Sequence, residues 1–345
     1  MDILLLVVSF TVILFGAELF TNGIEWFGRK LNLSEGAIGS VLAAVGTALP
    51  ETMIPFIAIV LSGGDAGGKV GVGAILGAPF MLSTLAMFVT GTAVWLMRRR
   101  RAAGQMLAVN PEVVSHDMAY FAVAYSIAIG AALLPVGFEW PRRLVAVLLI
   151  GIYAFHVLGH LKAEAAVHHE LEPLRFHKLD RGAPQHPEPP RFFIVSIQVV
   201  FALVCIIGGA WGFVRAVEDL SASLGLNPTL MALVIAPVAT ELPEKLNSVL
   251  WVRRGKDTLA MGNITGAMVF QSAIPTSIAL VFAPALWSVA GAGIAFLSAG
   301  IAFASAAMIF VPMIIRKRLS ARGLLVGGVF YLAYLGVVIF TLARA

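Results

Sequence analysis

The chain has 345 residues, of which 59% are hydrophobic and only 12% are charged. A soluble domain has about 45–50% apolar and about 25% charged residues, so this composition excludes an ordinary soluble globule. The single cysteine, Cys205, excludes an intrachain disulfide. Long apolar runs recur from residue 3 to residue 343. We therefore expect an all-α polytopic membrane protein.

Ten membrane spans are predicted at about 20 residues per crossing. They cover residues 3–28, 34–62, 70–97, 117–135 and 143–161, and then 192–218, 227–252, 258–283, 286–313 and 322–343. A polar stretch with five prolines, residues 162–190, lies between the two sets and is predicted to be a flexible linker. The chain thus divides into residues 1–161, 162–190 and 191–345.

Basic residues predict the orientation, because cytoplasmic loops carry an excess of Lys and Arg. With the N-terminus outside, eighteen basic residues fall on the inner side, among them Arg98 to Arg101, and five fall on the outer side, among them Arg142. We therefore expect a protein of the cell (inner) membrane with both termini outside and a cytoplasmic linker. The remaining basic residue, Lys245, falls inside a span.

An internal repeat relates the two halves. LNLSEGAIGSVLAAVGTALPE at 31–51 aligns with LGLNPTLMALVIAPVATELPE at 224–244 at a constant offset of 193, and both copies keep T-x-L-P-E. GAILGA at 73–78 and GNITGA at 262–267 follow. Five spans separate the copies, so they cross the membrane in opposite directions. The fold expected is two inverted five-helix repeats, with repeat cores at about 31–97 and 224–283.

Each copy places a proline and a glutamate inside a span. Pro50 and Pro243 remove a helix hydrogen bond, so each span is predicted to break there. Glu51 and Glu244 follow at once, and a charge at that depth costs roughly 2.5–3.5 kcal/mol. A bound cation or proton would offset this cost; two protonated glutamates bonded to backbone are the structural alternative. Carboxylate, hydroxyl and carbonyl oxygens suit Ca²⁺, Na⁺ or H⁺.

These motifs resemble those of the calcium/cation antiporter superfamily, the family of sodium/calcium exchangers. Its paired motifs, of the types G-T-S-x-P-E and G-N-x-x-G-S-N, appear here as GTALPE with GAILGAPF and as ATELPE with GNITGAMVF. The resemblance implies that Glu51 and Glu244 ligate the transported cation. It further implicates Thr47, Thr240, Asn263, Gln271 and the carbonyls of Ala44 and Pro237.

Several positions depart from that pattern. The motif serine is Ala48 in one repeat and Glu241 in the other, and a polar position of the next helix is Leu82 in the first repeat and Gln271 in the second. Glu241 and Lys245 stand i and i+4 on one helical face. Either they neutralise each other, or Lys245 reaches toward Glu244 and replaces a bound cation with a built-in charge.

The function expected is secondary antiport of a cation, Ca²⁺ or a related ion, against Na⁺ or H⁺ by alternating access. A non-transporting scaffold or an ion or pH sensor is the alternative. No enzyme motif, cofactor motif or nucleic-acid motif occurs, so cations and the lipid bilayer are the expected partners. Two other features stay open: Glu18 in the first span could line the access path, and His156, His160 and Glu164 have a spacing that could hold a metal or be only interfacial.

Overall fold

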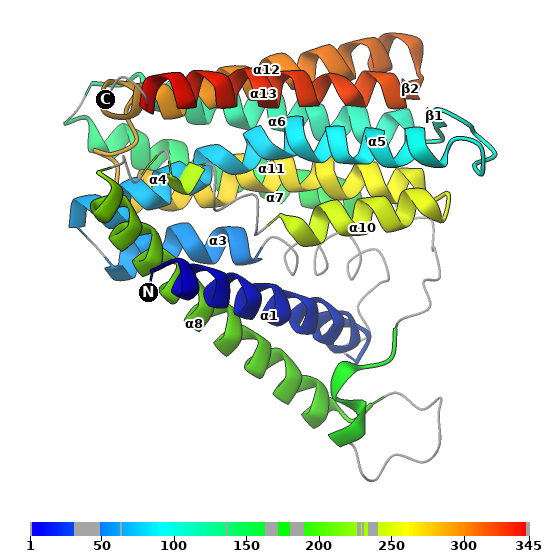
Figure 1. Ribbon diagram of the computed structural model, residues 1–345, viewed down its shortest axis with the longest axis horizontal. Helices are drawn as coiled ribbons and strands as arrows, with labels where there is room; N and C mark the ends of the chain where they lie inside the picture. The colour runs from blue at the N-terminus through cyan, green and yellow to red at the C-terminus, as the bar shows by residue number, and fades with distance from the viewer. Residues whose placement is uncertain are drawn as a thin grey trace.

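The computed structural model is almost entirely helical (Figure 1). It describes residues 2–30, 49–62, 64–135, 137–162, 172–179, 190–225, 229, 231–233 and 241–342. The first half contains α1 (Asp2–Lys30), α3 (Leu49–Phe56), the π-helical η2 (Ile57–Ser62), α4 (Gly64–Met81), the π-helical η3 (Leu82–Ala86), α5 (Met87–Met97), β1 (Met106–Leu107), α6 (Pro111–Ala132) and α7 (Glu139–Lys162). After the 3₁₀ turn η4 (Arg175–Leu179) come α8 (Phe192–Leu224), α10 (Leu242–Arg253), α11 (Asp257–Phe282), α12 (Val289–Arg316), β2 (Leu319–Ser320) and α13 (Ala321–Leu342).

Eight helices within the described residues are long and apolar enough to cross a membrane. They correspond to eight of the ten predicted spans, and α3 with η2 and α10 occupy the ends of the second and seventh. Residues 34–48 of the second span and most of residues 227–240 of the seventh lie outside the described residues. The all-α, multi-span architecture predicted from the sequence is confirmed.

Local signals set several helix ends. The predicted fourth span starts at residue 117, but α6 begins at Pro111, because the Asn110 side chain accepts a hydrogen bond from the Glu112 backbone N–H at 3.0 Å. Proline is well suited to this first position, where its missing N–H breaks no helical bond. A glycine sets the end of α8. This helix continues to Leu224 and ends at Gly225, whose φ of 64° lies in the left-handed region.

Burial separates central helices from peripheral ones. In the most apolar 18-residue stretches of α4–α5 and of α11, 83% and 78% of the stretch is buried inside the protein. In the corresponding stretch of α7 only 17% is buried. α11 packs against α6, α7, α10, α4 and α3, so it is the helix around which the larger bundle is built (Figure 1). The apolar side chains left exposed on the peripheral helices face the region that lipid fills.

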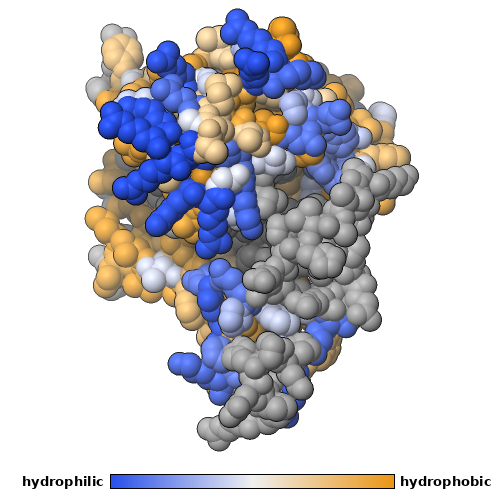
Figure 2. Space-filling view, turned by 90° about the vertical axis from the view of Figure 1, so that its right-hand side faces the viewer, coloured by the Kyte–Doolittle hydropathy of each residue, from blue (hydrophilic) through white to orange (hydrophobic). Residues whose placement is uncertain are grey.

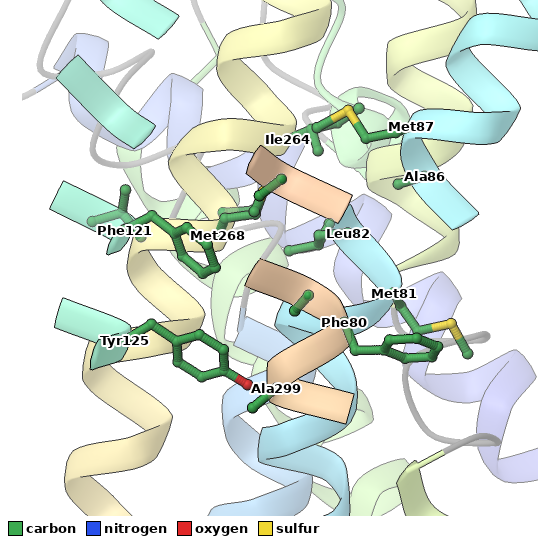
Figure 3. Close-up of a cluster of buried hydrophobic side chains, with 14 of the residues drawn as sticks. Phe80, Met81, Leu82, Ala86, Met87, Phe121, Tyr125, Ile264, Met268 and Ala299 are labelled. Carbon is green, nitrogen blue, oxygen red and sulfur yellow. The ribbon is translucent and has the colours of Figure 1, made fainter. Parts of the chain in front are cut away.

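The interior of this bundle is a large apolar cluster. Figure 3 shows part of it, where Leu82 of η3 lies among Phe80 of α4 and Ile264 and Met268 of α11. Phe121 and Tyr125 of α6 close the cluster from a third side. The helices that carry GAILGA and GNITGA, α4 and α11, therefore meet through close-packed hydrophobic side chains. This packing fixes the relative position of the two halves.

α1 and α8 form a separate pair beside the bundle (Figure 1). They approach closely at two glycines: a Cβ on Gly16 would lie 3.0 Å from the Ala202 carbonyl oxygen, and one on Gly209 would lie 3.0 Å from the Ser9 carbonyl oxygen. Gly16 and Gly209 are 193 residues apart, the offset of the internal repeat. Equivalent residues of the two halves thus make equivalent contacts, as two repeats facing each other should.

One end of the bundle is strongly polar. Figure 2 looks onto this end and shows hydrophilic side chains gathered over it. The short strands β1 and β2 pair there in antiparallel fashion, Met106 with Ser320, and they join the loop after α5 to the loop after α12. The Arg101 side chain donates a hydrogen bond to the carbonyl of Val252 in the last turn of α10. The loop after α10 therefore lies beside these two loops. Three of the basic loops that the sequence assigned to one side of the membrane therefore do lie together.

Part of the predicted flexible linker is held in place. Residues 172–179 dock against α1 and α8: Asn22 Nδ2 donates to the Pro173 carbonyl at 3.2 Å, and the Phe176 N–H donates to Gln198 Oε1 at 2.8 Å. Both polar side chains are buried, and buried polar groups need such partners. The expectation of a freely flexible connection is corrected for these residues, while 163–171 and 180–189 lie outside the described chain.

Candidate ion-binding site

Two helices begin at the repeated Leu-Pro-Glu sequence. α3 starts at Leu49 and α10 starts at Leu242, which are 193 residues apart. Each proline lies in the first turn, where its missing N–H leaves no helical bond unmade. The residues before Leu49 lie outside the described residues, whereas Glu241, the N-cap residue of α10, is described. The start of α10 at Leu242 therefore agrees with the helix break predicted at Pro243, and it places the positive end of the helix dipole at this turn.

Glu51 occupies the first turn of α3 and is buried, with 6% of its surface exposed. α3 carries no basic residue along its length and packs against α4, α8 and α11. A carboxylate in such a place is stable only when a proton, a cation or hydrogen-bond donors neutralise it. Glu244 begins the equivalent turn of α10, and its side chain lies outside the described part of the structure.

The second repeat adds a buried ion pair. Lys245 Nζ lies 3.1 Å from Glu241 Oε2, and the two side chains are 6% and 1% exposed. Glu241 occupies the N-cap position of α10, without a side-chain capping hydrogen bond, and Lys245 follows one turn later. This contact matches the interpretation in which the two residues neutralise each other. The other interpretation, a contact of Lys245 with Glu244, concerns a side chain that is not described.

α11 supplies the remaining polar candidates. Gln271 is 2% exposed, and its Oε1 atom has no hydrogen-bond partner among the described residues. Asn263 is half-buried two turns earlier on the same helix. α11 contacts both α3 and α10. An acceptor oxygen of this kind, on the helix shared by the two breaks, has the chemistry of a ligand for a hard cation.

The other predicted ligands cannot be placed. Thr47, Ala44, Thr240 and Pro237 all lie outside the described residues. The structure therefore brings one glutamate, one neutralised acid–base pair and one amide to the helices around the two breaks.

Glu18 does not belong to this set. Its side chain is exposed on α1, and its Oε1 atom lies 3.2 Å from the Arg175 guanidinium of η4. An exposed pair of this type contributes about 0–1 kcal/mol to stability. Glu18 therefore contacts the docked part of the linker and does not lie among the buried residues of the two helix breaks.

Two arginines differ from their expected surface positions. Arg142, assigned from the sequence to the outer surface, is fully buried. Its guanidinium donates to the carbonyls of Ala131 at 3.2 Å, Leu134 at 2.6 Å and Pro284 at 3.0 Å. The last carbonyls of a helix lack intrahelical partners, so one cation here satisfies the ends of both α6 and α11.

Arg101 is the second. It ends the Arg98 to Arg101 run, yet its side chain is 6% exposed and pairs with the buried Asp257 at 2.5 Å. Asp257 Oδ2 also accepts the Ala108 N–H at 2.8 Å. This contact ties a loop of the first half to the start of α11. The sequence contained no signal for it, because the two residues are 156 positions apart.

Comparisons with known proteins agree with this geometry. The family model described as sodium/calcium exchanger protein matches residues 1–162 and 194–343. A putative antiporter CaxA of Alkalimonas amylolytica is 22% identical over 300 residues, covering 83% of this chain and 82% of that protein. An uncharacterised membrane protein of Methanocaldococcus jannaschii is 21% identical over 264 residues, covering 74% of this chain and 73% of that protein.

Solved structures share the fold. The crystal structure of the H⁺/Ca²⁺ exchanger CAX superposes with a TM-score of 0.73 at 15% identity, over 97% of this chain and 82% of that one. A structure of the sodium-calcium exchanger NCX_Mj, soaked with Na⁺ and Sr²⁺, superposes with a TM-score of 0.59 at 15% identity, over 97% and 99% of the two chains.

Proposed function

This chain belongs to the sodium/calcium exchanger protein family, whose members are cation antiporters, and we propose that it exchanges Ca²⁺ against H⁺ across the cell membrane. The observation that carries this proposal is the burial of Glu51 in the first turn of α3, next to α11, which also contacts α10 of the other repeat. A buried carboxyl group at this depth can exchange a proton for a hard cation such as Ca²⁺.

The charge balance of the two breaks favours a divalent ion. The contact between Glu241 and Lys245 leaves that pair without net charge, so Glu51 and Glu244 supply two negative charges. One Ca²⁺ or two protons neutralise them equally well. Competition of the two for the same carboxylates is sufficient to couple their movements, because each state of the transporter then carries one cargo or the other.

The lack of polar side chains at several motif positions favours H⁺ over Na⁺ as the coupling ion. Ala48, Ala78, Ala267 and Leu82 stand where the family pattern has hydroxyl or other polar groups. Sodium needs several oxygen ligands per ion, whereas a proton needs only a carboxylate. Na⁺ remains the alternative coupling ion that the experiment compares.

The test uses purified protein in proteoliposomes. An outward H⁺ gradient should drive Ca²⁺ uptake, and an equal Na⁺ gradient should drive much less. Glu51→Gln and Glu244→Gln should each lower uptake to that of protein-free vesicles, because a neutral amide cannot exchange a proton for Ca²⁺. Glu18→Gln is the matched control, since it removes an exposed glutamate, and it should keep uptake near the wild-type rate.

Two results would overturn the proposal. Undiminished uptake in both interior variants would show that these glutamates do not carry the ion. The absence of gradient-driven uptake of any cation by the wild type would instead favour the scaffold or sensor alternative. A membrane potential clamped with K⁺ and valinomycin gives a further check, because exchange of one Ca²⁺ for two protons moves no net charge and should not respond to it.

The proposed orientation has both termini outside and the linker in the cytoplasm. The clustering of the basic loops at one end of the bundle supports it (Figure 2), because the cytoplasmic side holds the Lys and Arg excess. Protease digestion of intact spheroplasts carrying a C-terminal tag should remove the tag. Protection of the tag until the cells are lysed would reverse the orientation.

A further inference from the structure

Four metal-ligating side chains meet where α6 begins and α7 ends. His116 and Asp117 come from α6, and His156 and His160 come from α7. One ligand atom from each residue lies within 4.8 Å of all the others. The spacing of His156, His160 and Glu164 could hold a metal or be only interfacial, and Glu164 lies outside the described residues. Beside the two histidines the structure places two residues about 40 positions earlier in the chain.

Asp117 is the centre of this cluster. Its Oδ1 atom lies 2.9 Å from His156 Nε2 and 2.8 Å from His160 Nε2. Its Oδ2 atom accepts a hydrogen bond from Thr265 Oγ1 of α11 at 2.5 Å. Asp117 is buried, and its carboxylate is held by groups from two other helices, α7 and α11.

The imidazoles are packed together and not scattered. The rings of His156 and His160 lie edge to face with centroids 4.7 Å apart, and the His116 ring lies 5.6 Å from His156 and 5.3 Å from His160. A glycine makes this approach possible: a Cβ on Gly159 would lie only 3.3 Å from His116 Nε2. The cluster therefore depends on a close contact between α6 and α7.

A second observation points to a missing ligand. His156 is 5% exposed, and its Nδ1 atom has no hydrogen-bond partner among the described residues. Buried ring nitrogens normally have a partner. The ring therefore has unused binding capacity next to the Asp117 carboxylate and the other two imidazoles.

We propose that His116, Asp117, His156 and His160 bind one transition-metal ion of the Zn²⁺ class. Three imidazoles and one carboxylate suit Zn²⁺, Co²⁺ or Ni²⁺, whereas Ca²⁺ and Mg²⁺ take oxygen ligands. The site is therefore chemically distinct from the carboxylate site of the proposed transport path. Tetrahedral Zn²⁺ has bonds of about 2.0–2.1 Å to imidazole nitrogen, and the four ligand atoms of the cluster lie within 4.8 Å of one another.

Access is from the surface. His116 and His160 are half-buried, while Asp117 and His156 are buried behind them. The cluster thus has two accessible ligands that can capture an ion and two interior ones that can hold it. Tyr120 packs against both His116 and His156, with ring centroids 4.7 Å and 5.2 Å away, and limits the room for larger ligands.

The first experiment is a Zn²⁺ titration of the full-length protein in detergent, in competition with a chromogenic chelator. We expect one Zn²⁺ per chain, and at least tenfold weaker binding in His156→Ala and in His160→Ala. His177→Ala is the matched control, because His177 lies on η4 outside the cluster. No saturable binding by the wild type, or unchanged affinity in both cluster variants, overturns the site.

Thr265 is predicted to be a positioning residue. Thr265→Val removes the hydroxyl that donates to Asp117 and should weaken Zn²⁺ binding about 10- to 100-fold, as loss of such a partner typically does. Thr265→Ser keeps the hydroxyl and should restore wild-type affinity. Equal weakening by both substitutions would indicate a packing effect and would refute this role.

A spectroscopic arm needs no variant and so does not depend on how the variants fold. Zn K-edge X-ray absorption of the loaded wild type should show a nitrogen-rich first shell at about 2.0–2.1 Å. A shell of oxygen alone overturns the proposal, because it would place the ion at carboxylates elsewhere. Glu51→Gln should bind Zn²⁺ like the wild type, which separates this site from the transport site.

One consequence rests on the proposed function. Thr265 lies in the GNITG motif of α11, two residues after Asn263. A metal ion held by α6 and α7 therefore restrains α11, so Zn²⁺ should slow Ca²⁺ exchange in the wild type and not in His156→Ala. Zn²⁺ binding without slower exchange overturns this linkage. A wild type that binds Zn²⁺ but shows no exchange at all refutes the proposed function and not the site.

Discussion

The helix breaks of the two repeats share the sequence Leu-Pro-Glu but differ in charge. α3 and α10 both begin one residue before a proline, 193 positions apart, and both carry a glutamate in the first turn. The first repeat has no basic residue in α3, whereas the second buries Lys245 against Glu241. The repeat has therefore kept its geometry while one copy acquired an internal ion pair.

The helices that follow the breaks differ in the same sense. In the first repeat Gly73 brings α4 into backbone contact with residue 229 of the second repeat, and Leu82 joins the apolar cluster (Figure 3). In the second repeat the position equivalent to Leu82 is the buried amide of Gln271. The comparison teaches that one half is held by close packing and the other by polar groups, so the ion site need not be symmetric.

Removing one member of the buried pair should have the largest effect on stability. Lys245→Met leaves the Glu241 carboxylate without its ammonium partner and should lower the free energy of unfolding by about 3–5 kcal/mol. The double variant Glu241→Gln/Lys245→Met removes both charges and should recover most of that loss. Chemical denaturation in detergent micelles, followed by tryptophan fluorescence, measures both.

A double variant as unstable as Lys245→Met would contradict this account of the pair. It would show that Lys245 is important through another contact, and the two repeats would then differ by more than one neutralised pair.

The close packing of the first repeat is tested at Gly73. A Cβ there would lie 2.1 Å from the Thr229 carbonyl oxygen, so Gly73→Ala must push the two backbones apart. We expect a loss of about 1–3 kcal/mol in the free energy of unfolding. Gly130→Ala on α6 is the control, because nothing lies within 4 Å of its added methyl group. Similar stability changes in both variants would argue against close packing as the special property of this region.

The smallest effect is expected at Gln271. Gln271→Leu gives the second repeat the residue of the first and should raise the KM for Ca²⁺ about two- to tenfold, because one polar interaction contributes roughly 0.5–1.5 kcal/mol. The reciprocal Leu82→Gln places an amide in the apolar cluster and should not improve affinity. Transport assays with both variants decide whether the asymmetry of the repeats matters for the ion. An unchanged KM in Gln271→Leu would remove this residue from the site.

The span order, the start of α10 at Leu242, and the grouping of basic loops could be predicted from the sequence. These features depend on local hydropathy, on proline and on the repeat, all of which are written along the chain. The burial of Arg142 could not be predicted, because the rule for basic residues gives only a side of the membrane and nothing local indicates that three helix-end carbonyls surround the guanidinium.

The sequence by itself determined that this protein is an all-helical membrane protein with an inverted repeat and a glutamate at each break, since these follow from composition and residue order. The tertiary structure alone decided which polar groups meet: Lys245 with Glu241, Arg101 with Asp257, and Asp117 with three histidines and Thr265. The physical reason is that a buried charge must find its partner wherever packing brings one, and most of these partners lie on other helices.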